Sequence, residues 1–369
     1  MGRVLFSVSA LALSTSSALA GGIERSTQSV APLFESGEYM EFSFGSFSPS
    51  VSGAGAGFFA GTNSGDMAGN QTTYSFAYKR ALNDQLDAAI IIDQPIGADV
   101  DYPTSSAPYP FAGSNAEVRS TAITGLLRYK MPSNFSVYGG LRAERVEGNL
   151  AIRAPLALFV PGAPGALNYA LDGEADWGLG YVVGVAWEKP EIAARVALTY
   201  NSAIKHTLDT TETGLAPIAL NGTLDVEVPQ SVNLEFQTGI AEDTLVFGSV
   251  RWVDWTAFNI TPQYLGQPVV SNDDDTFSTS LGIGRRFNEN WSGAIILGYE
   301  KTQGTPTGNL GPTDGYKSIG LAATYTVDNI KITGGVRYVD IGDATTKGVN
   351  SNFSDNDGIG VGIRVAYSF

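Results

Sequence analysis

Apolar and polar residues alternate along most of the chain. Between Trp291 and Tyr299, the odd positions carry Trp, Gly, Ile, Leu and Tyr, and most of the even positions are small or polar. The end of the chain repeats the pattern, because every second residue from Ile359 to Phe369 is apolar. A period of two is typical of β-strands that turn one face toward apolar surroundings. The pattern therefore predicts an all-β protein.

The alternating segments number about fourteen, and connections of two kinds join them. The segments are 38–50, 71–80, 86–95, 118–131, 134–147, 174–188, 191–204, 223–238, 244–255, 276–287, 291–301, 316–327, 330–342 and 357–369. The short connections are 81–85, 132–133, 189–190, 239–243, 288–290 and 328–329, and the long ones are 51–70, 96–117, 148–173, 205–222, 256–275, 302–315 and 343–356. Short turns on one rim and long loops on the other are typical of an outer-membrane β-barrel.

The predicted strands carry apolar faces that no predicted helix covers. After residue 20 the chain has no apolar run of about 20 residues, the length of a transmembrane helix. Closing the sheet into a barrel pairs both of its edges, so that the apolar faces can meet lipid. We therefore predict a transmembrane antiparallel β-barrel of about 14 strands. The alternative is a secreted protein in which two such sheets pack face to face.

Residues 1–20 have the features of an export signal. Arg3 supplies a positive charge, residues 4–13 are mostly apolar, and Ala18-Leu19-Ala20 forms a cleavage site of the small-x-small kind. An uncleaved membrane anchor is the alternative. We predict a signal peptide at 1–20 and localisation in the outer membrane of a Gram-negative cell.

The composition argues against several classes of function. The formal net charge is −15, cysteine is absent, and His206 is the single histidine. Ser202 lies close to His206 in sequence, but no motif around the pair suggests a hydrolase. The acidic run Asn272–Asp275 matches no defined calcium loop. We therefore predict no enzyme activity, no cofactor, no metal and no nucleic-acid partner.

Four regions of the chain carry distinctive motifs. In chain order they are WGLGYVVGVAWE (Trp177–Glu188) with YNSAIKH (Tyr200–His206), VEVPQSVNLEFQTGI (Val226–Ile240), VRWVDWTAF (Val250–Phe258) and GRRFNENWSGAIILGYEK (Gly284–Lys301). These regions resemble the FadL/TodX family of outer-membrane transporters for long-chain fatty acids and other hydrophobic compounds. The resemblance implies substrate capture by extracellular loops, an N-terminal hatch inside the barrel, and exit through the wall beside a kinked third strand. The Asn-Pro-Ala motif of the family's hatch is absent here. We predict a short plug at 21–37 and the barrel at 38–369.

The third predicted strand contains residues that should interrupt its pairing. Pro95 cannot donate a hydrogen bond to a neighbouring strand, and Gly97 bends easily. Unpaired backbone in a barrel wall is tolerated where it meets a cavity. We therefore predict a lateral opening formed by Asp93, Gln94, Pro95, Ile96 and Gly97. In the alternative interpretation the strand simply ends at Gln94. Pro229 marks a second interruption, which a β-bulge alone would also explain.

The predicted loop 151–173 is unusually apolar for an exposed connection. Exposed apolar patches usually mark binding surfaces. We predict that a lipid tail contacts Leu156, Leu158, Phe159, Val160 and Leu167. Alternatively, this loop folds into the barrel mouth and only fills space.

Opposite the lipid-facing positions, alternation places several basic residues inside the barrel. Arg142, Arg251 and Arg337 are our candidates for binding the carboxylate of a fatty acid through charge-assisted hydrogen bonds. The alternative is that they pair with acidic residues such as Glu144 and Glu300 in a structural network.

The sequence thus favours uptake of long-chain fatty acids or other hydrophobic small molecules by a monomeric barrel that contacts outer-membrane lipid and lipopolysaccharide. A general diffusion porin and a structural barrel without transport activity are the alternatives. A porin needs a polar constriction loop, whereas the candidate loop here is apolar.

Overall fold

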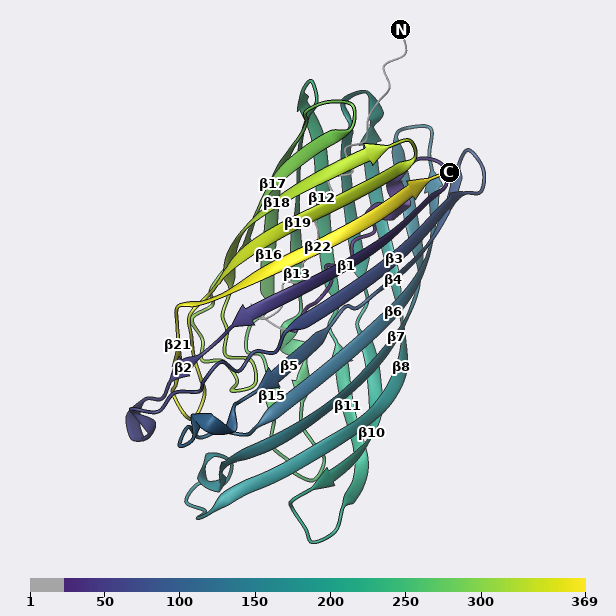
Figure 1. The fold of residues 1–369 in the computed structure, drawn as a ribbon. Coiled ribbons are helices and arrows are strands. Elements are labelled where there is room, and N and C mark those ends of the chain that lie inside the picture. Colours follow the sequence, from purple (N-terminus) through teal and green to yellow (C-terminus); the bar gives the residue numbers. More distant parts are fainter. Residues whose placement is uncertain (1–22) are drawn as a thin grey trace.

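The computed structural model describes residues 23–369, so the predicted signal peptide lies outside the described residues. They form a closed antiparallel barrel of fourteen strands, as predicted (Figure 1). Three wall positions are each built from two consecutive strands. In order around the wall the strands are β1 (Tyr39–Ser50), β3 (Gln71–Ala81), β4 (Leu86–Asp93) with β5 (Gly97–Asp101), β6 (Asn115–Lys130), β7 (Phe135–Pro155), β8 (Ala166–Lys189), β9 (Ala194–Asn201) with β10 (Ile204–Thr213), β11 (Leu220–Val228) with β12 (Ser231–Ala241), β13 (Thr244–Val253), β16 (Thr276–Arg286), β17 (Trp291–Glu300), β18 (Tyr316–Val327), β19 (Ile330–Ile341) and β22 (Asn356–Ser368).

Short elements occupy the connections. They are the strands β2 (Gly53–Ala54), β14 (Asn259–Ile260), β15 (Val270–Ser271), β20 (Ala344–Thr345) and β21 (Asn352–Phe353), and the 3-10 helices η1 (Ala31–Phe34), η2 (Gly57–Phe59), η3 (Thr104–Ser106), η4 (Leu156–Leu158), η5 (Pro190–Ile192) and η6 (Trp255–Ala257). Within residues 23–369 no helix is long and apolar enough to cross a membrane.

The first and last strands close the barrel. β1 pairs with β22 along its whole length, from Tyr39 opposite Ser368 to Ser50 opposite Asp357, and its other edge pairs with β3. Side chains that point outward are apolar, and aromatic residues such as Trp177, Trp291 and Phe369 are exposed among them. The alternating face therefore lies on the outside, where lipid can cover it.

Toward the long loops, the apolar face changes sides. On β10, Ile204 and Leu208 point inward and are buried, whereas Lys205 and Asp209 are exposed. On β11, Leu224 and Val226 are likewise buried, with polar residues between them. These segments are apolar inside and polar outside, as expected for strands that project from the membrane into water.

Two segments that the sequence analysis predicted as loops are in fact strands for most of their length. The segments 148–173 and 205–222 are mostly strand, because β7 continues to Pro155, β8 begins at Ala166, and β10 and β11 form a long hairpin. Only residues 156–165 and 214–219 connect these strands. The prediction of loops was wrong because these strands continue beyond the membrane, where apolar residues face inward and polar residues face outward.

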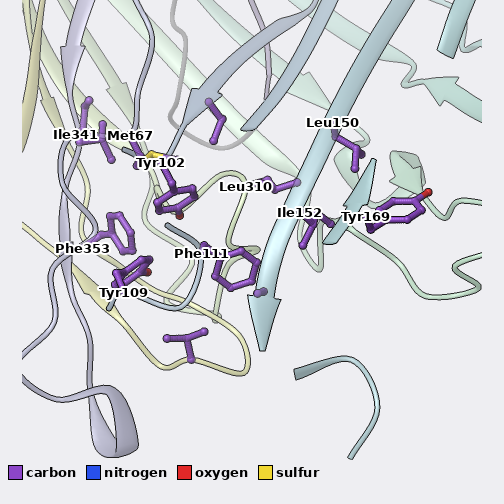
Figure 2. Packing of buried hydrophobic residues seen from close by; sticks show 14 of the residues in the cluster. Met67, Tyr102, Tyr109, Phe111, Leu150, Ile152, Tyr169, Leu310, Ile341 and Phe353 are labelled. Carbon is purple, nitrogen blue, oxygen red and sulfur yellow. The ribbon is translucent and has the colours of Figure 1, made fainter. Parts of the chain in front are cut away.

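The long connections gather over one end of the barrel around a buried apolar cluster (Figure 2). Met67 follows β1, Tyr102 and Phe111 lie between β5 and β6, Leu310 precedes β18, and Phe353 precedes β22. Tyr102 stacks on Tyr109 at a ring-centroid distance of 5.6 Å. Residues distant in sequence thus form a packed cap over the barrel mouth.

Candidate functional site

The wall is interrupted between β3 and the β4–β5 position. β3 pairs with β4 only as far as Phe76 opposite Ile92. β5 pairs with β6, and its other edge is bonded to residues 67–69 rather than to β3. If the register continued, Tyr74 would face Gln94. Instead, the Tyr74 backbone N–H donates to the side-chain Oε1 of Gln94 at 3.0 Å. A side chain therefore replaces the missing backbone hydrogen bond at this break, which spans residues 94–96.

The N-terminal segment satisfies the backbone of the break. The N–H of Arg25 donates to the carbonyl of Pro95, and the N–H of Gly97 donates to the carbonyl of Ile23, both at 2.8 Å. Glu24 forms a β-bridge with Ile96. The backbone groups of Pro95 and Gly97 thus find partners in residues 23–25, and those of Ile96 pair with the Ser120 hydroxyl, as buried backbone requires.

Arg25 stands directly at the break. Its Nε donates to the carbonyl of Gly97 at 2.7 Å, and a Cβ added to Gly97 would lie 2.9 Å from that Nε. Glycine therefore leaves the space that the arginine side chain occupies. Burial lowers the pKa of Arg25 to about 9, and the nearby Asp99 carboxylate offsets part of that fall. The guanidinium is consequently charged at neutral pH.

A buried ion pair fixes the same segment to the opposite wall. Glu24 Oε1 accepts a hydrogen bond from Nε of Arg251 at 2.6 Å, and it lies 2.6 Å from Nη2 in the same ion pair. Arg251 also donates to Ser231 and Asn233 on β12. Burial raises the pKa of Glu24, and the facing Arg251 offsets part of that rise. Farther along the segment, the Phe34 ring lies 4.4 Å from the guanidinium carbon of Arg128.

An apolar cavity of about 150 Å³ adjoins the break. Ile23 and Ile96 bound it there, and inward-facing residues of β10 and β11 form a second side. The cap closes it with residues from the connections after β14 and β17. The apolar lining includes Val100, Val118, Val146, Leu150, Leu171, Leu208, Leu224, Val226, Phe258, Ile260, Val269, Val270 and Leu310. This composition suits a small apolar molecule with few polar groups.

A second cavity, of about 210 Å³, reaches the break from the other direction. We call it the polar cavity because eight charged residues line it, although apolar side chains such as Phe236 and Phe247 line it as well. Asp93, Gln94, Thr73 and Tyr74 line it at the break. Its charged lining consists of Arg25, Glu41, Asp93, Arg195, Glu235, Arg251, Arg337 and Arg364. Ile96, Gly97 and Ala98 line the apolar cavity instead. The break thus lies between two cavities, and among the described residues arginines line the polar cavity but not the apolar one.

The predicted lateral-opening residues are therefore brought together at the break, whereas the predicted substrate-binding residues are dispersed. Leu167 is buried in the cap, and Leu156, Leu158 and Phe159 pack against it. Val160 is exposed. Among the described residues that line the apolar cavity, none belongs to this predicted set.

The three candidate arginines also lie outside the apolar cavity. Arg142 donates from Nε to the Thr124 hydroxyl at 2.9 Å. Arg251 pairs with Glu24, as described above. Arg337 donates from Nη2 to the Ser318 hydroxyl at 2.8 Å and lies over the Tyr316 ring. Arg251 and Arg337 line the polar cavity.

Several cavity residues were missed by the sequence analysis. Leu208, Leu224 and Val226 lie in segments that alternate with the opposite phase to the lipid-facing strands. This reversed alternation is the sequence signal that could have identified them as inward-facing. Val269, Val270 and Leu310 come from connections in which no periodicity identifies an inward direction.

The chain matches one known protein family. Residues 25–304 match the model of a family described as outer membrane protein transport protein (OMPP1/FadL/TodX). The chain belongs to the FadL/TodX family. The family consists of outer-membrane transport channels rather than enzymes, so the predictions of location and of no enzyme activity are confirmed. The FadL/TodX resemblance read from the four sequence regions is likewise confirmed.

Solved structures of FadL/TodX proteins share the fold at low sequence identity. A Pseudomonas aeruginosa FadL homologue superimposes with a TM-score of 0.77 at 15% identity, covering 92% of each chain. The Ralstonia pickettii toluene transporter TbuX gives 0.65 at 14% identity, covering 92% of this chain and 91% of that chain. The Pseudomonas putida toluene transporter TodX gives 0.65 at 12% identity, covering 95% and 96%. No curated protein sequence matches the chain significantly.

Proposed function

We propose that this barrel takes up long-chain fatty acids or other hydrophobic small molecules, and that they leave sideways through the break between β3 and β5. The observation that carries the proposal is the apolar cavity of about 150 Å³ that ends at Ile96 and Gly97 in the break. Its neighbours in fold include proteins described as toluene transporters, which supports a hydrophobic cargo.

The contrast between the cavities favours the sideways route. A hydrophobic molecule gains roughly 25 cal/mol for each Å² of apolar surface kept out of water. It keeps that gain when it moves from the apolar cavity into lipid. On entering the polar cavity it would instead meet the charged groups of Arg195, Arg251 and Arg364.

The predicted residues have separate roles in this proposal. Asp93, Gln94, Pro95, Ile96 and Gly97 form the exit. Leu156, Leu158 and Phe159, at the edge of the cap, form part of the entry surface, with Val160 exposed beside them and Leu167 supporting them from within. For a fatty acid, Arg251 and Arg337 offer cationic groups only in the polar cavity, and Arg142 lies in the wall. Residues 23–37 act as the plug, and the barrel works as a monomer among lipopolysaccharide.

Reversible cross-linking across the break tests the route. The native chain has no cysteine, so a short bis-methanethiosulfonate linker can join Tyr74→Cys to Gln94→Cys through two reducible disulfides without reaction elsewhere in the chain. We expect cross-linking to abolish most barrel-dependent uptake of a neutral fluorescent hydrocarbon, and reduction to restore it. The matched control joins Phe76→Cys to Ile92→Cys, which already face each other in the paired part of the wall.

Three results contradict the proposal. Uptake that survives the cross-link at the break would exclude this exit. A large, steady ion current through the purified barrel in a planar bilayer would instead favour a general diffusion porin. A barrel that shows neither uptake nor ligand binding would be structural.

A further inference from the structure

We propose that the route through this barrel carries charges of opposite sign in series, so that it passes uncharged hydrophobic molecules and retards ions of either sign. The inference rests on the proposed function and narrows its substrate class, from fatty acids or other hydrophobic small molecules to uncharged ones. Carboxylates at the apolar cavity act first, and Arg25 at the exit acts second.

The apolar cavity offers no cation to a bound anion. Among the described residues that line it, none is a lysine or an arginine. On the cap side, the lining includes Asp273, Asp274 and Asp314. Asp273 pairs with Lys347 at 2.8 Å, but Asp274 and Asp314 form no ion pair among the described residues. A carboxylate that entered would be buried without a counter-ion and near like charges, which is unfavourable.

The two uncompensated aspartates are held in place by neutral donors. Asp274 accepts a hydrogen bond from the Thr305 hydroxyl at 2.6 Å. Asp314 accepts from the backbone N–H groups of Gln303 at 2.8 Å and Gly304 at 2.7 Å. Neutral donors stabilise these carboxylates without cancelling their charge, so the cavity keeps a negative potential.

The other acidic residues at this cavity contribute less to its negative potential. Glu117 is paired with Arg119, and Glu147 is paired with Arg145. By alternation, these four residues share the face of β6 and β7 that carries Thr121 and Ile123, which is the outer face. Their charges are therefore balanced outside the barrel, and the cap aspartates dominate inside.

At the exit, the cation against Gly97 is Arg25, and the Asp99 carboxylate lies near it. Arg25 is only 8% exposed, and its Nε is used by the Gly97 carbonyl. Its Nη1 has no hydrogen-bond partner among the described residues. A cationic molecule that leaves the cavity past Gly97 therefore approaches an arginine with an unused donor and is repelled. An uncharged molecule meets neither penalty.

A matched ligand series separates the two charges. The probes are 4-phenylbutanol, 4-phenylbutylamine and 4-phenylbutanoate, which share one apolar skeleton. Binding is measured at pH 7.5 by displacement of a neutral naphthalene dye from the barrel in phosphatidylcholine nanodiscs. Transport is measured as barrel-dependent uptake into Gram-negative cells, after subtraction of uptake by cells that lack the barrel.

We expect the alcohol to bind and to be transported. The carboxylate should bind about tenfold more weakly, as expected for like charges about 10 Å apart near a protein surface. The amine should bind at least as well as the alcohol but be taken up several-fold more slowly. The double variant Asp274→Asn with Asp314→Asn should reduce the difference in affinity between the alcohol and the carboxylate. Arg25→Gln should raise the ratio of amine uptake to alcohol uptake.

Asp328→Asn, in the exposed turn between β18 and β19, is the control for removal of a negative charge and should change neither ratio. If Asp314→Asn prevents folding, Asp274→Asn alone still tests the cavity charge. Equal binding of carboxylate and alcohol, or equal uptake of amine and alcohol, overturns the inference and leaves the proposed function intact. Failure of all three probes to displace the dye contradicts the proposed function itself.

Discussion

The hydrogen bond between Gln94 and Tyr74 gives the sharpest test of the break. Gln94→Leu keeps the approximate size of the side chain but removes the oxygen that accepts the Tyr74 N–H at 3.0 Å. An unsatisfied backbone donor that is partly removed from water costs about 1–3 kcal/mol. The closed arrangement should be destabilised by that amount, and the open population should rise roughly fivefold to a hundredfold.

Hydrogen exchange measures the first step of this prediction and uptake measures the second. In the Gln94→Leu variant, the Tyr74 amide should exchange faster by the same factor, while amides in the paired part of β3, such as Phe76, should not change. Barrel-dependent uptake of a neutral hydrophobic dye should increase. Gln94→Glu retains an acceptor oxygen and should leave the Tyr74 amide protected.

The two measurements can fail separately. Unchanged exchange at Tyr74 would refute the idea that Gln94 closes the wall. Faster exchange without faster uptake would show that the break opens but does not limit transport.

Three further changes test the cavity, the N-terminal segment and the wall. Val226→Trp should fill the apolar cavity and weaken ligand binding at least about tenfold, as measured by dye displacement, whereas unchanged binding would place the ligand elsewhere. Arg251→Met should leave the Glu24 carboxylate buried without a cation and lower stability by about 3–5 kcal/mol in urea unfolding, and adding Glu24→Gln should recover part of that loss. Gly140→Ala should lower the melting temperature, because the new Cβ would lie 1.7 Å from the carbonyl oxygen of Gly125; Gly125→Ala, with nothing within 4 Å, should not.

The lipid-facing part of the fold could be predicted from the sequence because one physical rule governs it without interruption. The segment predicted at 291–301 is β17, Trp291–Glu300, and the one predicted at 316–327 is β18, Tyr316–Val327. Each residue there faces either lipid or the barrel interior, so polarity alternates with a period of two. The short turns between such strands follow directly.

The candidate site was less predictable because long-range contacts create it. Pro95 and Gly97 indicated an interruption, and the pairing between β3 and β4 does stop before them. The position of Arg25 against Gly97 depends on how the N-terminal segment crosses the barrel, and no local pattern encodes it. Arg142, Arg251 and Arg337 do carry polar partners, but alternation could not distinguish the polar cavity from the apolar one.

The break also explains how the apolar cavity can adjoin the wall. Ile90 and Ile92 point outward on β4, whereas Ile96 is buried and lines the apolar cavity with Val100. In an uninterrupted strand, residues separated by an even number point to the same face. The interruption at residues 94–96 thus turns the apolar side of this wall position from the outside to the inside. At that point lipid-facing and cavity-facing apolar surfaces lie on consecutive segments of one chain, with Gln94 and the guanidinium of Arg25 close to the change. The proposed sideways route requires this arrangement, because it brings the two apolar surfaces next to each other.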